Sequence, residues 1–563
     1  MLFQNRKVKL VSLLFICVAL LLSACGSSSE PKTTDTGEKT KTNSESSTDI
    51  KMNPAGELPI TDEKVTLQVL MLGEPLVENF ATNAFTKWLE EQTNVKIEWE
   101  IVPKNAAIEK LNVTLAGGDY PDVIMGFPIN TVQQSLYGKD GVFLALNDLI
   151  EEYGVETKKM FENSPNVKGL ITAPDGNIYA LPQVNECYHC MMSSRMWINQ
   201  DWLEALKLDM PTTTEEYYEV LKAFKEKDPN GNKIADEIPL AGYTEQGNVS
   251  FASFIMSSFV KRGNEDLIID NGEIKASFVQ PGWKEGTLYM KRLYDEGLIA
   301  SESFTQDRNS LKRMASSGEQ NIVGSFPQNW IAEVVDVNTE KGMAYAHTVP
   351  PLKGPGGVQS TPYNPFSMKQ GQFVITDKAK YPEIAFRLAD FMYSEEASIR
   401  SNVGVFETDW EAAAPGDKGI DGREGVWKKV AKPGGVQPVQ NNRWVNTGPS
   451  YRSKDFRFGE VELNANGGEQ ILYNETSTKY EPYRLDVDEV VPPMFFTQEQ
   501  SEELANLLTT ISDYKNQFLA RAITGDIDVE KEWDNYLLTL ESMKLERFLQ
   551  IHQEAYESYI KNK

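Results

Sequence analysis

Lys64-Val65-Thr66-Leu67-Gln68-Val69-Leu70 decides the fold class, because its apolar and polar side chains alternate as they do in a β-strand. The segment 78–92 then places its apolar residues on one helical face, and residues 95–101 alternate again. A strand, a helix and a second strand in this order predict a βαβ unit with two parallel strands. We therefore expect an α/β protein.

The next residues extend this unit. A second helix is predicted over 106–116, where Gly117 and Gly118 provide the glycine that helix C-caps favour. Asp119-Tyr120-Pro121-Asp122-Val123-Ile124 then leads into another short strand.

Further helices are predicted later in the chain. Thr213 and Glu216 have the spacing of a capping box, which predicts a helix start at this position. Residues 498–519 and 528–556 read as two long helices that pack on a domain and carry no evident chemistry.

The N-terminus has the features of a signal peptide, since basic residues precede an apolar run over 10–22 that is too short for an ordinary membrane span. The run ends in Leu22-Ser23-Ala24-Cys25, which resembles the bacterial lipobox. This resemblance implies cleavage after residues 1–24, a diacylglycerol anchor on Cys25 and a location at the extracellular face of the cell membrane. The alternative is a plain secretory peptide in which the cysteine falls at this position by chance.

Length and composition limit the remaining chain. Residues 25–59 are predicted to form a flexible tether, because Ser, Thr, Glu and Lys dominate and few apolar residues offset the entropy of folding. The 563 residues are too many for one core, so two or more domains are expected. The formal charge of −26 argues against a nucleic-acid partner, whereas a small anionic ligand needs only local arginines.

One segment resembles a signature of extracellular solute-binding proteins of the oligosaccharide type, the ligand receptors of ABC importers. Its sequence is Leu115-Ala116-Gly117-Gly118-Asp119-Tyr120-Pro121-Asp122-Val123. The chain is most similar to large lipoproteins of the Lpl-like branch of Gram-positive bacteria. The resemblance implies a periplasmic-binding-protein-like (Venus flytrap) fold with two discontinuous α/β lobes. By analogy, the first lobe takes residues 60–185 plus 345–430, and the second takes 186–344 plus 431–563.

The function that this resemblance implies is capture of an extracellular oligosaccharide between the lobes and its delivery to an ABC permease, with no chemical change. One alternative is a receptor that reports to a membrane sensor. Another is a membrane-anchored carbohydrate-active enzyme. The sequence contains no G-x-S-x-G, H-E-x-x-H or P-loop motif, but two carboxylates suffice for glycoside hydrolysis, so this alternative stays open.

Residues 228–237 have the spacing of an EF-hand-type calcium loop, and the pattern also resembles the calcium loop of oligosaccharide-binding family members. The oxygen ligands would come from Asp228, Asn230, Asn232, the carbonyl of Ile234, Asp236 and Glu237. Lys233 departs from the pattern, because this position normally needs a glycine for its positive φ. The predicted role of calcium is structural, and the alternative is an acidic turn without metal.

Cys187-Tyr188-His189-Cys190 supports several interpretations. A short disulfide fits an exported protein. The alternatives are two free thiols, a thioredoxin-like redox pair, or a zinc site that would lack a local fourth ligand.

Sugar ligands stack on aromatic rings and bind polar side chains through their hydroxyls. The candidate ligand-binding residues are Trp197, Trp283, Trp330, Arg443 and Trp444, although a buried tryptophan more often belongs to a core. The stretch 443–458 is locally basic, with Arg443 and Arg452 among its cations. It suggests contact with a carboxylated sugar such as a uronate, and the alternative is neutralisation of acidic neighbours.

Overall fold

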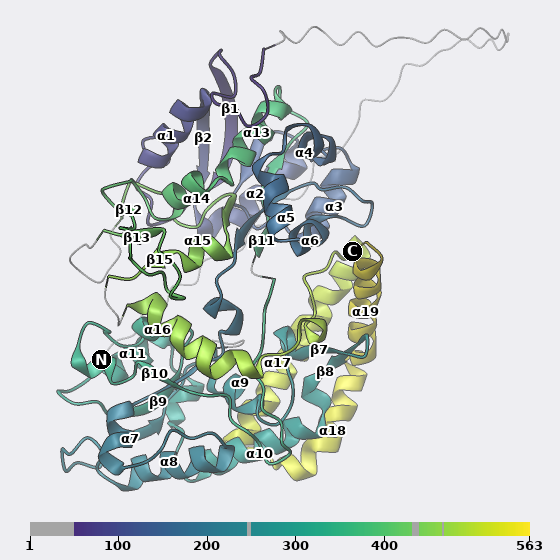
Figure 1. Cartoon of the computed structure of the whole chain (residues 1–563). Helices are drawn as coiled ribbons and strands as arrows, with labels where there is room; N and C mark the ends of the chain where they lie inside the picture. Colours follow the sequence, from purple (N-terminus) through teal and green to yellow (C-terminus); the bar gives the residue numbers. More distant parts are fainter. Residues whose placement is uncertain (1–49, 245–248, 367, 431–438, 464–466, 563) are drawn as a thin grey trace, which may run out of the picture. The chain divides into compact units, whose positions relative to one another are not determined.

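The computed structural model describes residues 50–562 apart from 245–248, 367, 431–438 and 464–466 (Figure 1). The signal peptide, Cys25 and most of the predicted tether lie outside these ranges. Residues 50–563 are grouped in one compact unit. Across the described ranges, none of the helices combines the length and apolar character that a membrane crossing requires.

The expected βαβ unit is present. β1 (Val65–Leu72) and β2 (Val95–Val102) are parallel and are connected through α1 (Ala84–Thr93). The alternation of β1 buries Leu67 and Val69 on one face, where they pack with Phe85 and Leu89 of α1.

The first sheet has six strands in the order β14-β4-β11-β3-β1-β2. It adds β3 (Val123–Met125), β4 (Leu181–Asn185), β11 (Met368–Ile375) and β14 (Ser450–Arg452). β11 is antiparallel to its neighbours, and the other strands run in one direction. The carboxyl ends of those strands therefore share one edge with the amino end of β11.

Helices cover both faces of this sheet. One face packs against α1 and α13 (Pro382–Met392), and the other packs against α2 (Ala107–Gly117). α2 ends as predicted, with Gly118 in the left-handed conformation at φ 72°.

The second sheet has the order β10-β5-β9-β6. Its strands are β5 (Met196–Ile198), β6 (Ile238–Leu240), β9 (Val323–Pro327) and β10 (His347–Val349). α8 (Thr214–Glu226) packs on it and begins with the predicted capping box of Thr213 and Glu216.

The remaining elements surround these two sheets. The helices are α3 (Thr131–Lys139), α4 (Asn147–Tyr153), α5 (Glu156–Asn163), α6 (Asn166–Ile171), α7 (Gln200–Leu206), α9 (Phe251–Met256), α10 (Pro281–Asp295), α11 (Arg308–Ser316), α12 (Glu340–Met343), α14 (Glu395–Asn402), α15 (Lys454–Phe458) and α16 (Gly468–Glu475). A two-stranded sheet contains β7 (Leu267–Asp270) and β8 (Glu273–Ala276), and a three-stranded sheet contains β12 (Trp410–Ala412), β13 (Trp427–Lys429) and β15 (Glu460–Val461).

Strand pairing differs from the expected lobe bounds. The analogy with the family placed β10 in the first lobe, but this strand pairs with β5 of the second sheet. It placed β14 in the second lobe, but it pairs with β4 of the first sheet. The chain passes between the lobes from β4 to β5, from β10 to β11, and from β15 to α16, whose Ile471 and Leu472 lie in the core behind the second sheet.

The prediction of one helix over 528–556 was wrong. The chain forms α18 (Val529–Ser542) and α19 (Leu545–Asn562), and Lys544 between them has φ 65°, which no right-handed helix accommodates. With α17 (Gln498–Ile523), they pack on the second lobe.

The predicted tether also extends too far. Arg387 of α13 is buried, and its Nη2 donates hydrogen bonds of 2.9 Å to the carbonyl oxygens of Pro54 and Glu57. Residues 50–59 are therefore held against the first lobe, although their composition suggests flexibility.

Candidate functional site

The carboxyl edge of the second sheet carries polar and aromatic side chains. Tyr243 follows β6, and its hydroxyl accepts a hydrogen bond of 3.2 Å from Nε2 of Gln328, which follows β9. Trp330 is half-buried beside them, and its ring lies over Gly468, where an added Cβ would come within 2.5 Å of Cη2. Ligands of α/β proteins bind outside the carboxyl ends of strands, so Trp330 is well placed for ligand contact.

Arg195 connects three segments beneath this edge. It is fully buried, and its Nη1 donates to Oδ1 of Asn329 at 2.7 Å. Its Nη2 donates to Oγ1 of Thr476 at 3.0 Å and to the carbonyl of His189. Burial lowers the pKa of Arg195 to about 10, which leaves it charged at neutral pH. A single arginine without a surrounding motif gives no sequence signal for this role.

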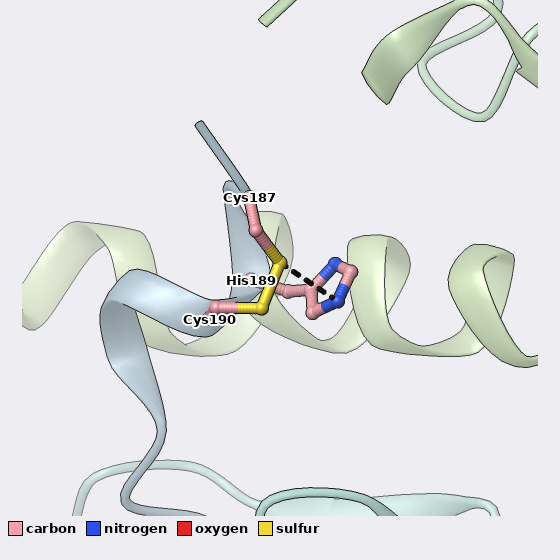
Figure 2. Close-up of side chains that lie close together, drawn as sticks. All are labelled: Cys187, His189 and Cys190. Carbon is pink, nitrogen blue, oxygen red and sulfur yellow. Dashed lines mark hydrogen bonds between the residues drawn. A yellow bond between two sulfur atoms is a disulfide. The ribbon is translucent and has the colours of Figure 1, made fainter. Parts of the chain in front are cut away.

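The chain between β4 and β5 contains a disulfide that joins Cys187 to Cys190 (Figure 2). Nε2 of His189 lies 3.3 Å from Sγ of Cys187. Because the sulfur atoms are bonded to each other, they are not thiolate ligands for zinc. The disulfide is thus the form that the structure contains among the alternatives.

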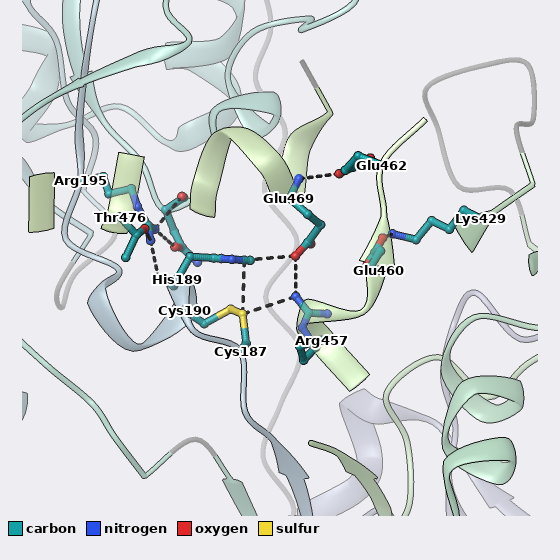
Figure 3. Close-up of polar contacts among 11 residues, drawn as sticks. Cys187, His189, Cys190, Arg195, Lys429, Arg457, Glu460, Glu462, Glu469 and Thr476 are labelled. Carbon is teal, nitrogen blue, oxygen red and sulfur yellow. Dashed lines mark hydrogen bonds and ion pairs between the residues drawn. A yellow bond between two sulfur atoms is a disulfide. The ribbon is translucent and has the colours of Figure 1, made fainter. Parts of the chain in front are cut away.

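The same disulfide contacts Arg457 of α15, which in turn pairs with Glu469 of α16 (Figure 3). Nη2 of Arg457 lies 3.6 Å from Sγ of Cys187 and 2.6 Å from Oε2 of Glu469. Burial lowers the pKa of His189 well below its usual value, and the charges of Arg195 and Arg457 lower it further. The imidazole is therefore neutral at neutral pH.

Two candidate ligand platforms belong to the core instead. Trp197 and Trp444 are each 0% exposed. The indole nitrogen of Trp197 donates to the carbonyl of Gln328 at 2.7 Å, and that of Trp444 donates to Oγ1 of Thr86 at 2.9 Å. Since both rings are enclosed, neither offers a face to a sugar in this structure.

The other two candidates, Trp283 and Arg443, are not enclosed in the way that Trp197 and Trp444 are. Trp283 is 3% exposed, yet it lines a cavity of about 370 Å³ together with Arg262 and Lys515, and its indole nitrogen is buried without a hydrogen-bond partner. Arg443 braces the first lobe, because its Nη1 donates to the carbonyl of Val403 at 2.8 Å.

The predicted calcium loop matches an EF-hand turn at one backbone position. Lys233 adopts φ 65°, the positive value normally supplied by glycine. The amides of Asn230 and Asn232 converge on Asp236, at 3.2 and 3.1 Å from its Oδ1.

Glu237 completes the set of acids at this loop. Its Oε1 is buried without a hydrogen-bond partner. Desolvation raises the pKa of Glu237, and the charges of Asp236 and Asp228 raise it further. A divalent cation would relieve this electrostatic cost, so the oxygen chemistry of the donors suits calcium, but among the described residues Asp228, Asp236 and Glu237 do not converge into a cluster that could hold a metal ion.

Comparison with known proteins identifies the family. Residues 73–399 match the model of the bacterial extracellular solute-binding proteins. The chain belongs to this family. A relative from Streptococcus pneumoniae, the fructooligosaccharide ABC transporter substrate-binding protein FusA, is 30% identical over 555 residues, which cover 96% of each chain.

Other similarities agree with the two-lobed fold. The solved structure of the S. pneumoniae FusA EF-hand mutant in complex with fructo-nystose matches with a TM-score of 0.72 and 27% identity, over 88% of this chain and all of that one. The polygalacturonan/rhamnogalacturonan-binding protein YtcQ of Bacillus subtilis is 25% identical, over 48% of this chain and 52% of its own. The protein is therefore a solute-binding protein and not an enzyme.

Proposed function

We propose that this solute-binding protein is anchored through Cys25, captures an extracellular oligosaccharide and delivers it to an ABC permease. Its similarity to FusA over nearly the whole chain is the observation that carries the proposal. The names of FusA and YtcQ refer to a neutral and an acidic saccharide respectively, and both offer hydroxyl-rich rings.

Binding on both lobes would drive the transport cycle. Trp330 supplies an apolar ring surface for stacking against a sugar, and Tyr243 and Asn329 supply polar groups at the same edge. A ligand that also contacts the first lobe stabilises the closed form, because only that form makes both sets of contacts. The permease would recognise this form.

Calcium is proposed as a structural ion in the loop 228–237. The positive φ of Lys233 and the unpartnered oxygen of Glu237 support it. The loop follows α8, so the ion would fix the connection between α8 and β6.

Calorimetric titration of residues 50–563 with neutral and acidic oligosaccharides tests the proposal. We expect binding of at least one sugar, recovery of that sugar intact, and loss of its uptake when the permease gene is deleted. Failure of every sugar to bind would contradict the proposal. Intact binding combined with unchanged uptake in the permease mutant would favour a sensor instead.

A further inference from the structure

Two cations flank β4 at the carboxyl edge of the first sheet. Lys369 lies at the amino end of β11, opposite Gln183, and Arg452 ends β14, opposite Asn185. Gln183 and Asn185 are two residues apart on β4 and project from the same face. Lys369 and Arg452 therefore project from that face as well, one on each side of β4.

The guanidinium of Arg452 has no acidic partner. Among the described residues, no carboxylate lies within 4.0 Å of it, and its Nε is buried without a hydrogen-bond partner. Oδ1 of neighbouring Asn185 is also buried and unpartnered. Polar atoms left without partners are costly, so a ligand that supplied hydrogen-bond partners here would be stabilised.

The nearby acids are already engaged with other cations. Glu469 pairs with Arg457, and Glu460 pairs with Lys429 (Figure 3). Glu74 pairs with Lys104 at 2.5 Å.

The side chain of Glu186, the residue after β4, projects from the opposite face of the strand. On that face its Oε1 accepts a hydrogen bond of 2.6 Å from Oγ of Ser164. Lys369 and Arg452 thus remain as excess positive charge in a chain whose net charge is −26.

The electrostatics of the two cations agree with this imbalance. Burial lowers the pKa of Arg452 to about 10, and repulsion by Arg457 contributes to the shift. Desolvation lowers the pKa of Lys369, and repulsion by Arg452 and Lys104 lowers it further. An anion placed between them would offset both effects.

We propose that Arg452 and Lys369 bind a carboxylate of an acidic, uronate-containing oligosaccharide, and that Asn185 binds an adjacent hydroxyl. This inference rests on the proposed oligosaccharide-binding function and names its substrate class. A guanidinium binds a carboxylate through two parallel hydrogen bonds, while an ammonium adds a point charge. A neutral sugar satisfies hydrogen bonds at this place but leaves the excess charge uncompensated.

The test compares matched ligands. Trimers of galacturonate and of mannuronate are titrated against residues 50–563, together with their methyl esters, which keep the rings and remove the charge, and with neutral kestose. We expect one acid trimer to bind about tenfold or more tightly than its ester, with an affinity that falls as salt increases.

Variants assign the effect to the two residues. Arg452→Gln should lower the affinity for that acid trimer by about tenfold or more, and should change the affinity for the ester much less. Lys369→Gln repeats the test at a more exposed position, where the ammonium gives up only a hydrogen bond of 3.4 Å to the carbonyl of Asn446. Arg423→Gln is the matched control, because it removes an exposed guanidinium that pairs with Asp421 and Asp455, and it should leave the affinities for the acid trimer and the ester unchanged.

The outcomes separate two failures. Equal binding of acid and ester, or acid binding that neither variant weakens, would overturn the inference while oligosaccharide binding stands. If no sugar bound at all, the proposed function itself would fail and this inference with it.

Discussion

Nη2 of Arg457 lies 2.6 Å from Oε2 of Glu469. This ion pair joins α15 to α16, the helices on either side of the segment that leads from β15 into the second lobe. The two side chains are only 12% and 22% exposed. Arg457→Met leaves Glu469 largely buried without its cation, so we expect the free energy of unfolding to fall by about 2–4 kcal/mol in urea titrations.

Lys110→Met is the control for this pair. Lys110 and Glu100 are 42% and 55% exposed, so loss of their ion pair should cost less than about 1 kcal/mol. Equal losses in the two variants would show that the burial of the Arg457 pair has no energetic consequence.

Reduction of the disulfide gives a second prediction. The bond closes a small loop in the chain between β4 and β5, and the chain-entropy model assigns such a loop about 2 kcal/mol. Adding a dithiol reductant to the wild-type chain should therefore lower its unfolding free energy by about this amount.

The variant with Cys187→Ala and Cys190→Ala should be less stable from the start and insensitive to the reductant. A reductant effect that persists in this variant would place its cause elsewhere in the chain.

The calcium loop gives a third prediction. Calcium at 100 times its dissociation constant should stabilise the folded chain by about 2.7 kcal/mol, measured as a rise in the unfolding temperature relative to chelator. Asp236→Asn should abolish this rise, because it removes a charged oxygen donor. Lys233→Gly should keep it and relieve about 1 kcal/mol of strain at φ 65°. A calcium-dependent rise in Asp236→Asn would exclude this loop as the site.

Periodicity in the sequence was sufficient to predict β1, α1, β2 and α2, since each has a repeating apolar face. It made no prediction for β14, because three residues carry too little pattern to show which sheet they join, and only the analogy with the family assigned them to the second lobe. The break at Lys544 was also missed, since the apolar face continues through it and no glycine or proline marks it.

The candidate site was predicted less completely than the fold. The basic stretch 443–458 drew attention to Arg452, but its partner Lys369 lies on a strand distant in sequence. Trp197 and Trp444 had the right chemistry for stacking, and only the tertiary packing shows that they are enclosed. Burial and long-range pairing are the properties that a local pattern does not contain.

The fourth prediction concerns Asp266, which is buried in the second lobe between two cations. Its Oδ1 lies 2.6 Å from Nη2 of Arg262, and Oδ2 accepts a hydrogen bond from Nζ of Lys515. Burial alone would raise the pKa of Asp266, but the charges of Arg262 and Lys515 outweigh it and lower the pKa overall. Asp266→Asn leaves two buried cations unpaired, so we expect a loss of about 3–5 kcal/mol at pH 7.

The sign of the pH dependence follows from this lowered pKa. The carboxylate stabilises the fold at pH values above its unfolded pKa of about 3.9, and this stabilisation is lost as the pH falls through the lower folded pKa. Urea unfolding of wild type and Asp266→Asn should therefore show a difference that is constant near neutrality and shrinks in acid. Asp295→Asn, which removes an exposed partner of Lys291, should stay within about 1 kcal/mol of wild type at every pH. A difference between wild type and Asp266→Asn that does not shrink in acid would mean that packing, and not the charge of Asp266, holds this cluster together.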